Sequence, residues 1–224
     1  MRFQDAARDA RTVVYAGIQA DPLVGRVARL LADATPAERW MARAVMNGER
    51  TDPDIWRRMF PALFGEGSVG EGPAASRAEQ LLAVSLEVAN RGDQARSSYR
   101  GAIVEELTSR LLAGGGRTVK RERRVLFDGV PAEIHPYDVT VESAARPEVY
   151  DCKWGASGIK ADVLNQLDDA RAHAEEEEIE LRVAIVVFDA ERSAEIRLDR
   201  ETARHDRTEL VALETLDRLG RRAP

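Results

Sequence analysis

Two short runs of alternating apolar residues, separated by a turn, constrain the fold of this 224-residue chain more than any other feature. The runs are Tyr137–Val141 and Val149–Trp154, and each carries a carboxylate, Asp138 and Asp151. In a β-strand, residues i and i+2 project from the same face, so Asp151 and Lys153 are expected to point together. If the two runs pair as a hairpin, Asp138 faces Asp151 across the ladder.

Two carboxylates and an ammonium group on one sheet face are costly to bury unless they have a use. Carboxylate oxygens hold a divalent cation, and a lysine beside them orients a water or stabilises developing negative charge. This combination predicts hydrolysis of a phosphodiester. Cys152, between Asp151 and Lys153, is expected to point into the opposite layer as a small apolar residue and not to be a nucleophile.

The composition sets broad bounds on the class of protein. The length allows one large domain, or a domain with a helical annex, and the net charge of −6 is not typical of a nucleic-acid binder. A local basic groove can still exist on an acidic protein. The single cysteine excludes an intramolecular disulfide and predicts a cytoplasmic location, and we expect neither a signal peptide nor a membrane span.

The first 92 residues are predicted to be entirely helical. Helices are expected at 5–19, 22–32, 36–47, 53–64 and 74–90. Three of them begin with a capping residue followed by proline at the first helical position: Asp21-Pro22, Thr35-Pro36 and Asp52-Pro53. The glycine-rich segment 65–73 is expected to be a linker.

Residues 93–224 are predicted to form an α/β domain. A helix over 93–113 ends at Gly114-Gly115-Gly116, and strands follow at 118–127, 133–142 and 148–154. A helix over 160–177, a strand over 181–188 and a final strand-then-helix unit over 209–221 complete the domain. This order predicts a mixed β-sheet flanked by helices, preceded by the helical region 1–92.

Four local features occur in order along this second region. The motif Gly101-Ala102-Ile103-Val104-Glu105 lies on the expected helix 93–113, Pro136-Tyr137-Asp138 begins a strand, Asp151-Cys152-Lys153 ends the next strand, and Gln166 lies on the following helix. Together they resemble the PD-(D/E)XK nuclease superfamily, with one extra residue between the proline and the first acid. The resemblance covers residues 93 to about 220 and implies the restriction-endonuclease-like fold.

The resemblance also implies a metal-dependent nuclease. Its catalytic residues would be Asp138, Asp151, Lys153, Glu105 and Gln166. Mg²⁺ or Mn²⁺ would be held by Asp138, Asp151, the backbone carbonyl of Cys152 and Glu105. DNA is the expected substrate and RNA the second candidate, and family members often act as homodimers or within larger defence, restriction or repair complexes.

Simpler interpretations stay open for each residue. Asp138 could be a surface aspartate, Glu105 an exposed helical glutamate and Gln166 a surface amide, while Asp151 and Lys153 could be an ion pair of little energetic value. Two other classes of protein also stay open. One is a module with the nuclease fold that binds nucleic acid or a partner without cutting. The other is a regulatory partner protein whose helical half is the functional part.

The segment Arg117–Arg124 is the strongest basic run of the chain. Its residues Lys120, Arg121, Arg123 and Arg124 are predicted to contact nucleic-acid phosphates. The alternative is a charged edge strand that prevents aggregation. Lys160 is expected near the N-terminus of a helix, where it could contact a further phosphate, and His135 is a candidate substrate contact.

Overall fold

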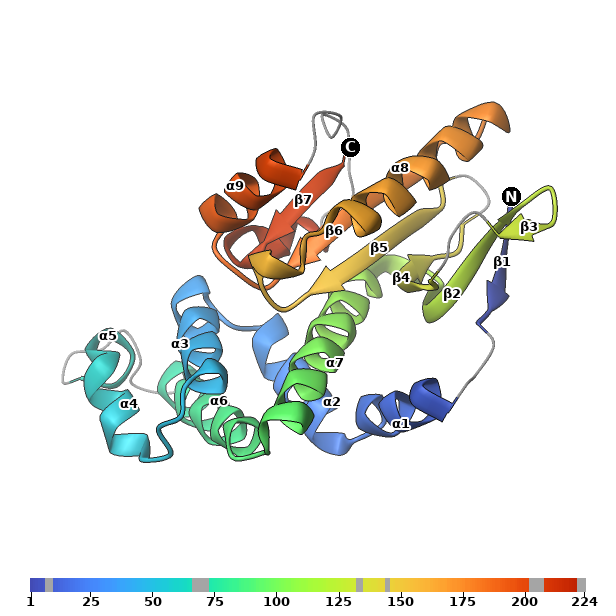
Figure 1. The fold of residues 1–224 in the computed structure, drawn as a ribbon. Helices are drawn as coiled ribbons and strands as arrows, with labels where there is room; N and C mark the ends of the chain where they lie inside the picture. The colour runs from blue at the N-terminus through green and yellow to red at the C-terminus, as the bar shows by residue number, and fades with distance from the viewer. Residues whose placement is uncertain (7–9, 66–72, 132–134, 144–145, 202–207, 221–224) are drawn as a thin grey trace. The chain divides into compact units, whose positions relative to one another are not determined.

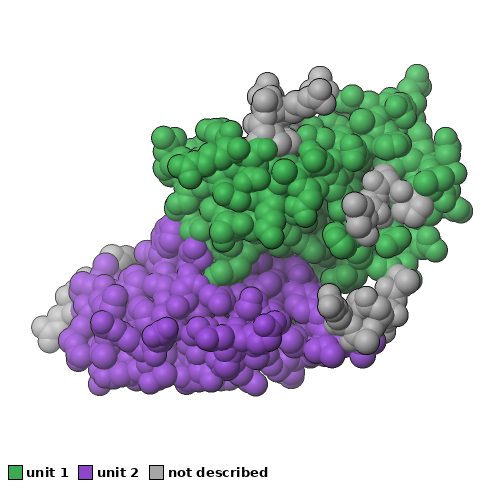
Figure 2. Space-filling model, in the orientation of Figure 1, with its two compact units in different colours: residues 1–9, 108–224 green, residues 10–107 purple. Residues whose placement is uncertain are grey.

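The computed structural model describes residues 1–6, 10–65, 73–131, 135–143, 146–201 and 208–220. The chain divides into two compact units (Figure 2). We call residues 1–9 and 108–224 the sheet unit, and residues 10–107 the helical unit. The division lies at Leu107 and Thr108, inside helix α7 (Asp93–Leu112), and not at the expected residue 92.

The helical unit follows the sequence prediction closely. Its helices are α1 (Ala10–Gln19), α2 (Pro22–Ala32), α3 (Pro36–Asn47), α4 (Pro53–Met59), α5 (Pro61–Phe64), α6 (Pro73–Ala89) and most of α7. Asp21, Thr35 and Asp52 cap the helices that begin at the predicted prolines. Helices α2 and α3 both pack against α6. The predicted linker 65–73 lies mostly outside the described residues.

The helix expected over 53–64 is divided in two. Phe60 has φ −122° and ψ 59°, which is not helical, and Pro61 begins α5. Proline disfavours the helical conformation of the residue before it and has no N–H to continue the ladder, so α4 ends at Met59. None of the helices in the described part of the chain is long and apolar enough to cross a membrane.

The sheet unit contains a mixed sheet of seven strands within the described residues (Figure 1). The strands are β1 (Arg2–Asp5), β2 (Val119–Phe127), β3 (Val130–Pro131), β4 (Tyr137–Val141), β5 (Glu148–Lys153), β6 (Arg182–Val187) and β7 (Glu209–Ala212). The order is β1-β2-β4-β5-β6-β7, with β3 paired to β2. Pairing is antiparallel from β1 to β5 and parallel from β5 to β7. The predicted α/β class and mixed sheet are confirmed.

Helices cover the sheet and connect its parallel strands. Helix α8 (Ala161–Glu176) joins β5 to β6, and α9 (Glu191–Glu201) joins β6 to β7 (Figure 1). Leu164 and Leu167 of α8 pack in one buried cluster with Val149 of β5 and Ile185 of β6. Cys152 is buried, as expected, and its Sγ lies 3.5 Å from Thr108 Oγ1 at the end of α7.

Further elements differ from the sequence prediction, among them β1 and α9. The region before residue 92 is not entirely helical, because β1 pairs antiparallel with residues 123–126 of β2. As a result, β2 lies between β1 and β4 at residues 123–126, so Arg123 and Arg124 are not on an edge strand. For the rest of Arg117–Arg124 the edge-strand interpretation stays open. Helix α9 was not predicted either.

Candidate metal centre

The predicted hairpin forms and brings the two aspartates to one end. Strands β4 and β5 are antiparallel, with Val139 opposite Tyr150. The next position in this register places Asp138 opposite Asp151. The Asp138 side chain accepts a hydrogen bond from the Cys152 backbone N–H at 2.6 Å. A carboxylate oxygen thus binds the β5 backbone where the paired part of the ladder ends.

Asp151 and Lys153 form a buried ion pair. Asp151 is 8% exposed, and its Oδ1 contacts the Lys153 ammonium. Apart from Lys153, this shielded oxygen has no hydrogen-bond partner among the described residues. Burial raises the pKa of Asp151 above its usual range although Lys153 opposes the shift. Among the described residues, Lys153 alone compensates this buried oxygen.

Lys153 is held as a cation. Burial lowers the pKa of its ammonium group, but interactions, chiefly with Asp151 and Asp138, together raise this pKa by more than burial lowers it. The net pKa therefore lies above the ordinary lysine value. A β-carbon added at Gly158 would lie 3.0 Å from Lys153 Cδ, so the lysine stem packs closely on this glycine. Lys153 is therefore fixed in place and suited to stabilise negative charge rather than to accept a proton.

These three side chains open into one cavity of about 400 Å³. Its lining combines the end of the β4–β5 hairpin with one face of α8: His135, Pro136, Asp138, Asp151, Lys153, Asp162, Val163, Asn165, Gln166 and Asp169. Four of these are carboxylates, against one lysine. Such a cavity attracts cations and repels a bare phosphate.

The α8 wall contains residues that our sequence analysis missed. Asp162, Asn165 and Asp169 line the cavity with Gln166. Positions i, i+3, i+4 and i+7 lie on one helix face, so this spacing was a readable signal. Electrostatic interaction with Asp162 raises the pKa of Asp151, and interaction with His135 lowers it.

Gln166 is bound to the segment that precedes β4. Its Nε2 donates to the His135 carbonyl at 3.0 Å, and its backbone carbonyl accepts from the Tyr137 hydroxyl at 3.2 Å. Gln166 thus joins α8 to the start of the strand that carries Asp138. A catalytic role for it stays a prediction.

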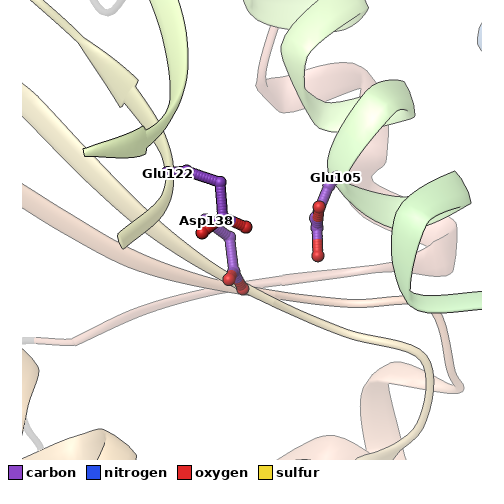
Figure 3. A group of neighbouring side chains, drawn as sticks. All are labelled: Glu105, Glu122 and Asp138. Atoms are coloured by element: carbon purple, nitrogen blue, oxygen red, sulfur yellow. The ribbon is translucent and has the colours of Figure 1, made fainter. Parts of the chain in front are cut away.

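Glu122 is a second residue that sequence analysis missed. Arg121 and Arg123 of β2 pair with β4, but Glu122 between them adopts a left-handed φ of 54°. A non-glycine residue in this region costs roughly 1–3 kcal/mol and is often found at functional sites. In Figure 3 the Glu122 side chain lies beside Asp138 of the neighbouring strand.

Glu105 of α7 is buried, at 5% exposure, so its interpretation as a solvated helical glutamate is wrong. Its carboxylate accepts hydrogen bonds from Tyr15 Oη at 2.6 Å and Gln19 Nε2 at 2.7 Å, both on α1. Gly101 lies one turn earlier on α7, and a β-carbon there would lie 2.9 Å from Tyr15 Oη. The Gly-x-x-x-Glu spacing therefore has a steric reason within the helical unit.

Within the sheet unit, one carboxylate oxygen of Glu122 and one of Asp138 lie within 4.8 Å of each other (Figure 3). Hard oxygen ligands of this kind suit Mg²⁺ or Mn²⁺. Asp151 Oδ1, which contacts the Lys153 ammonium, is a further carboxylate oxygen of the same type. These residues fit the divalent cation predicted from the sequence. The Cys152 carbonyl stays a predicted ligand.

Several cations of the basic segment Arg117–Arg124 form ion pairs with carboxylates of the same chain. Arg123 is buried and pairs with Asp5 and with Glu142, whose Oε1 lies 2.7 Å from Arg123 Nε. We therefore assign Arg123 a structural role and withdraw it from the predicted phosphate contacts. Lys120 is exposed and pairs with Glu142 at 3.2 Å. Phosphate contacts by Lys120, Arg121, Arg124 and Lys160 stay predictions, and Lys160 is exposed at the start of α8.

No protein-family model matches the chain, and no curated protein matches its sequence. Among solved structures, protein VC1899 from Vibrio cholerae is similar at 15% sequence identity and a TM-score of 0.42. The match covers 98% of this chain and 56% of that protein, so this chain spans little more than half of its length. A likeness at this level supports no conclusion about activity.

Proposed function

We propose that this protein is a metal-dependent nuclease that hydrolyses phosphodiester bonds, with DNA as the expected substrate and RNA as the second candidate. One observation carries the proposal: Asp138, Asp151 and Lys153 line a single cavity, in which Asp151 and Lys153 form a buried ion pair. An arrangement so costly in desolvation is typical of a functional site.

Asp138 and Asp151 are the residues that would hold Mg²⁺ or Mn²⁺, with Glu122 beside Asp138. Glu105 stays a predicted ligand. When bound, the cation would acidify a water and neutralise charge on the scissile phosphate. The protein keeps Asp138 in position through the Cys152 N–H. The left-handed backbone at Glu122 turns a second carboxylate toward the same place.

Lys153 supplies the positive charge of the site. Its stem rests on Gly158 and its ammonium contacts Asp151, so little side-chain freedom is lost when a substrate binds. A fixed ammonium stabilises the additional negative charge of a phosphorane-like transition state. The surrounding carboxylates would repel the phosphate in the absence of a cation, which predicts that cleavage stops completely in EDTA.

A cleavage assay tests the proposal. The purified chain would be incubated with supercoiled plasmid, single-stranded DNA and RNA, each with Mg²⁺, Mn²⁺ or EDTA, beside the Lys153→Ala variant. Metal-dependent cleavage that the variant lacks would support the proposal. A gel shift without cleavage would favour the non-cutting module. The absence of both cleavage and a gel shift would favour a regulatory partner protein. Assembly as a homodimer or within a defence, restriction or repair complex stays a prediction from the resemblance.

A further inference from the structure

The segment between β5 and α8, residues 155–161, joins two walls of the cavity. Lys153 precedes it and Asp162 follows it, and both line the cavity. Gly158 in this segment packs on the lysine stem, because a β-carbon there would lie 3.0 Å from Lys153 Cδ and 3.1 Å from its Cβ and Cγ. Residues 155–161, which we call the connecting segment, therefore help to fix both the lysine and the start of the α8 wall.

The N-terminus of α8 is capped by a residue from another helix. Lys160 occupies the N-cap position and makes no capping hydrogen bond with its side chain. The N–H of Ala161, the first residue of α8, donates instead to Glu201 Oε2 of α9 at 3.1 Å. A carboxylate at this end of a helix satisfies an unpaired N–H and interacts favourably with the helix dipole. Glu201 thus supplies the cap that Lys160 does not.

Two further side chains bind the connecting segment. Arg197, one turn before Glu201 on α9, donates from Nε to the Ile159 carbonyl at 3.0 Å. The two α9 side chains also pair with each other at 2.6 Å. Asp189, which follows β6, accepts a hydrogen bond from the Ala156 N–H at 3.0 Å. Three backbone groups of the connecting segment are therefore bound by side chains that lie on α9 or just before it.

These contacts give α9 a role that its packing does not supply. Among its described side chains α9 buries only Ala194, so the helix adds little apolar area to the core. The parallel strands β6 and β7 need a crossover connection, but a crossover does not require polar side chains directed at another loop. The Arg197 and Glu201 side chains are only 36% and 21% exposed, so both are partly withdrawn from water at this contact.

We propose that Asp189, Arg197 and Glu201 are positioning residues that hold Lys153 and the start of the α8 wall in place. None of the three is among the residues that line the cavity, so they act through the connecting segment. A charged group stabilises a transition state only when it is already aimed at the developing charge, and small displacements are costly. This inference rests on the proposed function and adds residues to it that lie outside the cavity.

A purely structural role is the competing explanation. In that case the three side chains would stabilise the start of α8 and the position of α9 without any effect on the lysine. Replacing them would lower the melting temperature and leave the Lys153 side chain where it is. A direct observation of Lys153 separates the two roles.

Nuclear magnetic resonance of a protein labelled with ¹³C-lysine provides this observation without requiring cleavage. The chain contains only three lysines, Lys120, Lys153 and Lys160, so the side-chain signals are few. Lys120→Arg and Lys160→Arg variants identify the remaining set of signals as that of Lys153.

Asp189→Ala and Glu201→Ala should each shift the Lys153 side-chain signals, because the connecting segment loses a contact in both variants. Glu195→Ala is the matched control. It removes a carboxylate from the same helix, where Glu195 forms an exposed pair with Arg192, and it should leave the Lys153 signals in place.

Cleavage kinetics test the consequence for the reaction. At saturating Mg²⁺ and well below the melting temperature, Asp189→Ala and Glu201→Ala should lower kcat by about tenfold or more, with KM for DNA little changed. Glu201→Gln keeps an oxygen that accepts from the Ala161 N–H, so it should recover most of the wild-type kcat and the wild-type Lys153 signals. Glu195→Ala should cut at the wild-type rate.

Unmoved Lys153 signals in folded Asp189→Ala and Glu201→Ala proteins would overturn the inference, and so would shifted signals with a wild-type kcat. An equal effect of Glu195→Ala would also overturn it. If Glu201→Ala does not fold, Arg197→Ala removes the neighbouring contact and makes the same prediction. A wild-type chain without cleavage would refute the proposed function, whereas the lysine signals would still test whether these residues hold Lys153.

Discussion

A β-carbon at position 101 would lie 2.9 Å from the hydroxyl oxygen of Tyr15, which donates a hydrogen bond to Glu105. The absence of a side chain at Gly101 thus allows α1 to approach α7 and hold a buried carboxylate. Tyr15 and Gln19 are in this sense positioning residues for Glu105. Neither was visible as a site residue in the sequence, because their partner is about 90 residues away.

The first prediction concerns this contact. Gly101→Ala should displace the Tyr15 hydroxyl and reduce metal-dependent cleavage several-fold, although alanine is intrinsically better than glycine in a helix by roughly 0.5–1 kcal/mol. Gly17→Ala is the matched control, because a β-carbon there meets nothing within 4 Å. Equal cleavage rates in both variants would show that Glu105 does not depend on Tyr15.

Lys153→Ala should reduce cleavage by orders of magnitude while metal binding stays nearly intact, because the change removes charge stabilisation and not a ligand. Gly158→Ala should give a milder loss by pushing on the lysine stem, which is packed at 3.0–3.1 Å from the added carbon. Initial rates at saturating Mg²⁺ measure both. Wild-type rates in Lys153→Ala would remove Lys153 from the mechanism.

The two aspartates should differ in their effect on stability. Asp138→Asn keeps an acceptor for the Cys152 N–H and relieves repulsion from Glu122, so the melting temperature in metal-free buffer should rise. Asp151→Asn leaves the Lys153 ammonium without its partner and should cost up to about 3 kcal/mol. Both should weaken Mn²⁺ binding in a calorimetric titration. Unchanged Mn²⁺ affinity in both would argue against a shared metal site.

Strand β2 offers a contrast between structural and exposed cations. Arg123→Gln breaks a buried pair with Asp5 and Glu142 and should destabilise the protein by about 3 kcal/mol. Lys120→Gln removes a more exposed pair and should cost less than about 1 kcal/mol, while the salt dependence of DNA binding becomes shallower. Urea unfolding and salt titration measure the two effects. Equal unfolding midpoints would contradict the structural role of Arg123.

The acid sensitivity of the helical unit should depend on Tyr99. The hydrogen bond from the Tyr99 hydroxyl lowers the pKa of Asp21 below the ordinary 3.8, and the hydrogen bond from the Leu23 N–H lowers it by a smaller amount. A depressed carboxyl pKa stabilises the fold above the unfolded value of about 3.8, and this stability is lost as the pH falls through the folded value. Tyr99→Phe should therefore be less stable at neutral pH and less sensitive to acid. Parallel pH profiles of urea midpoints would refute this.

Local signals in the sequence were enough to predict much of the fold. The caps at Asp21, Thr35 and Asp52 fixed three helix starts, because a capping side chain and a following proline act within one turn. Alternation in β4 and β5 predicted the hairpin and brought Asp138 and Asp151 to one cavity.

The remaining features depend on contacts that no short segment contains. Strand β1 is mostly polar and is recognisable only through its pairing with β2. The left-handed backbone at Glu122 lies between two residues of β2 that pair with β4, and nothing in the basic run itself indicated that its glutamate would lie beside Asp138. Helix α9 buries only Ala194 among its described side chains, which leaves almost no apolar periodicity to detect.

The pairing of β1 with β2 also bears on biosynthesis. Arg2 pairs with Leu126, so β1 and β2 are neighbours in the sheet although the whole helical unit separates them in the sequence. During synthesis, α2, α3 and α6 can pack together as soon as α6 has left the ribosome, whereas β1 stays unpaired until β2 has left the ribosome. Arg2, Gln4 and Asp5 give this waiting strand charged and polar side chains, which discourage it from pairing with other nascent chains. The sheet edge formed by β1 therefore cannot be completed before β2 has been synthesised.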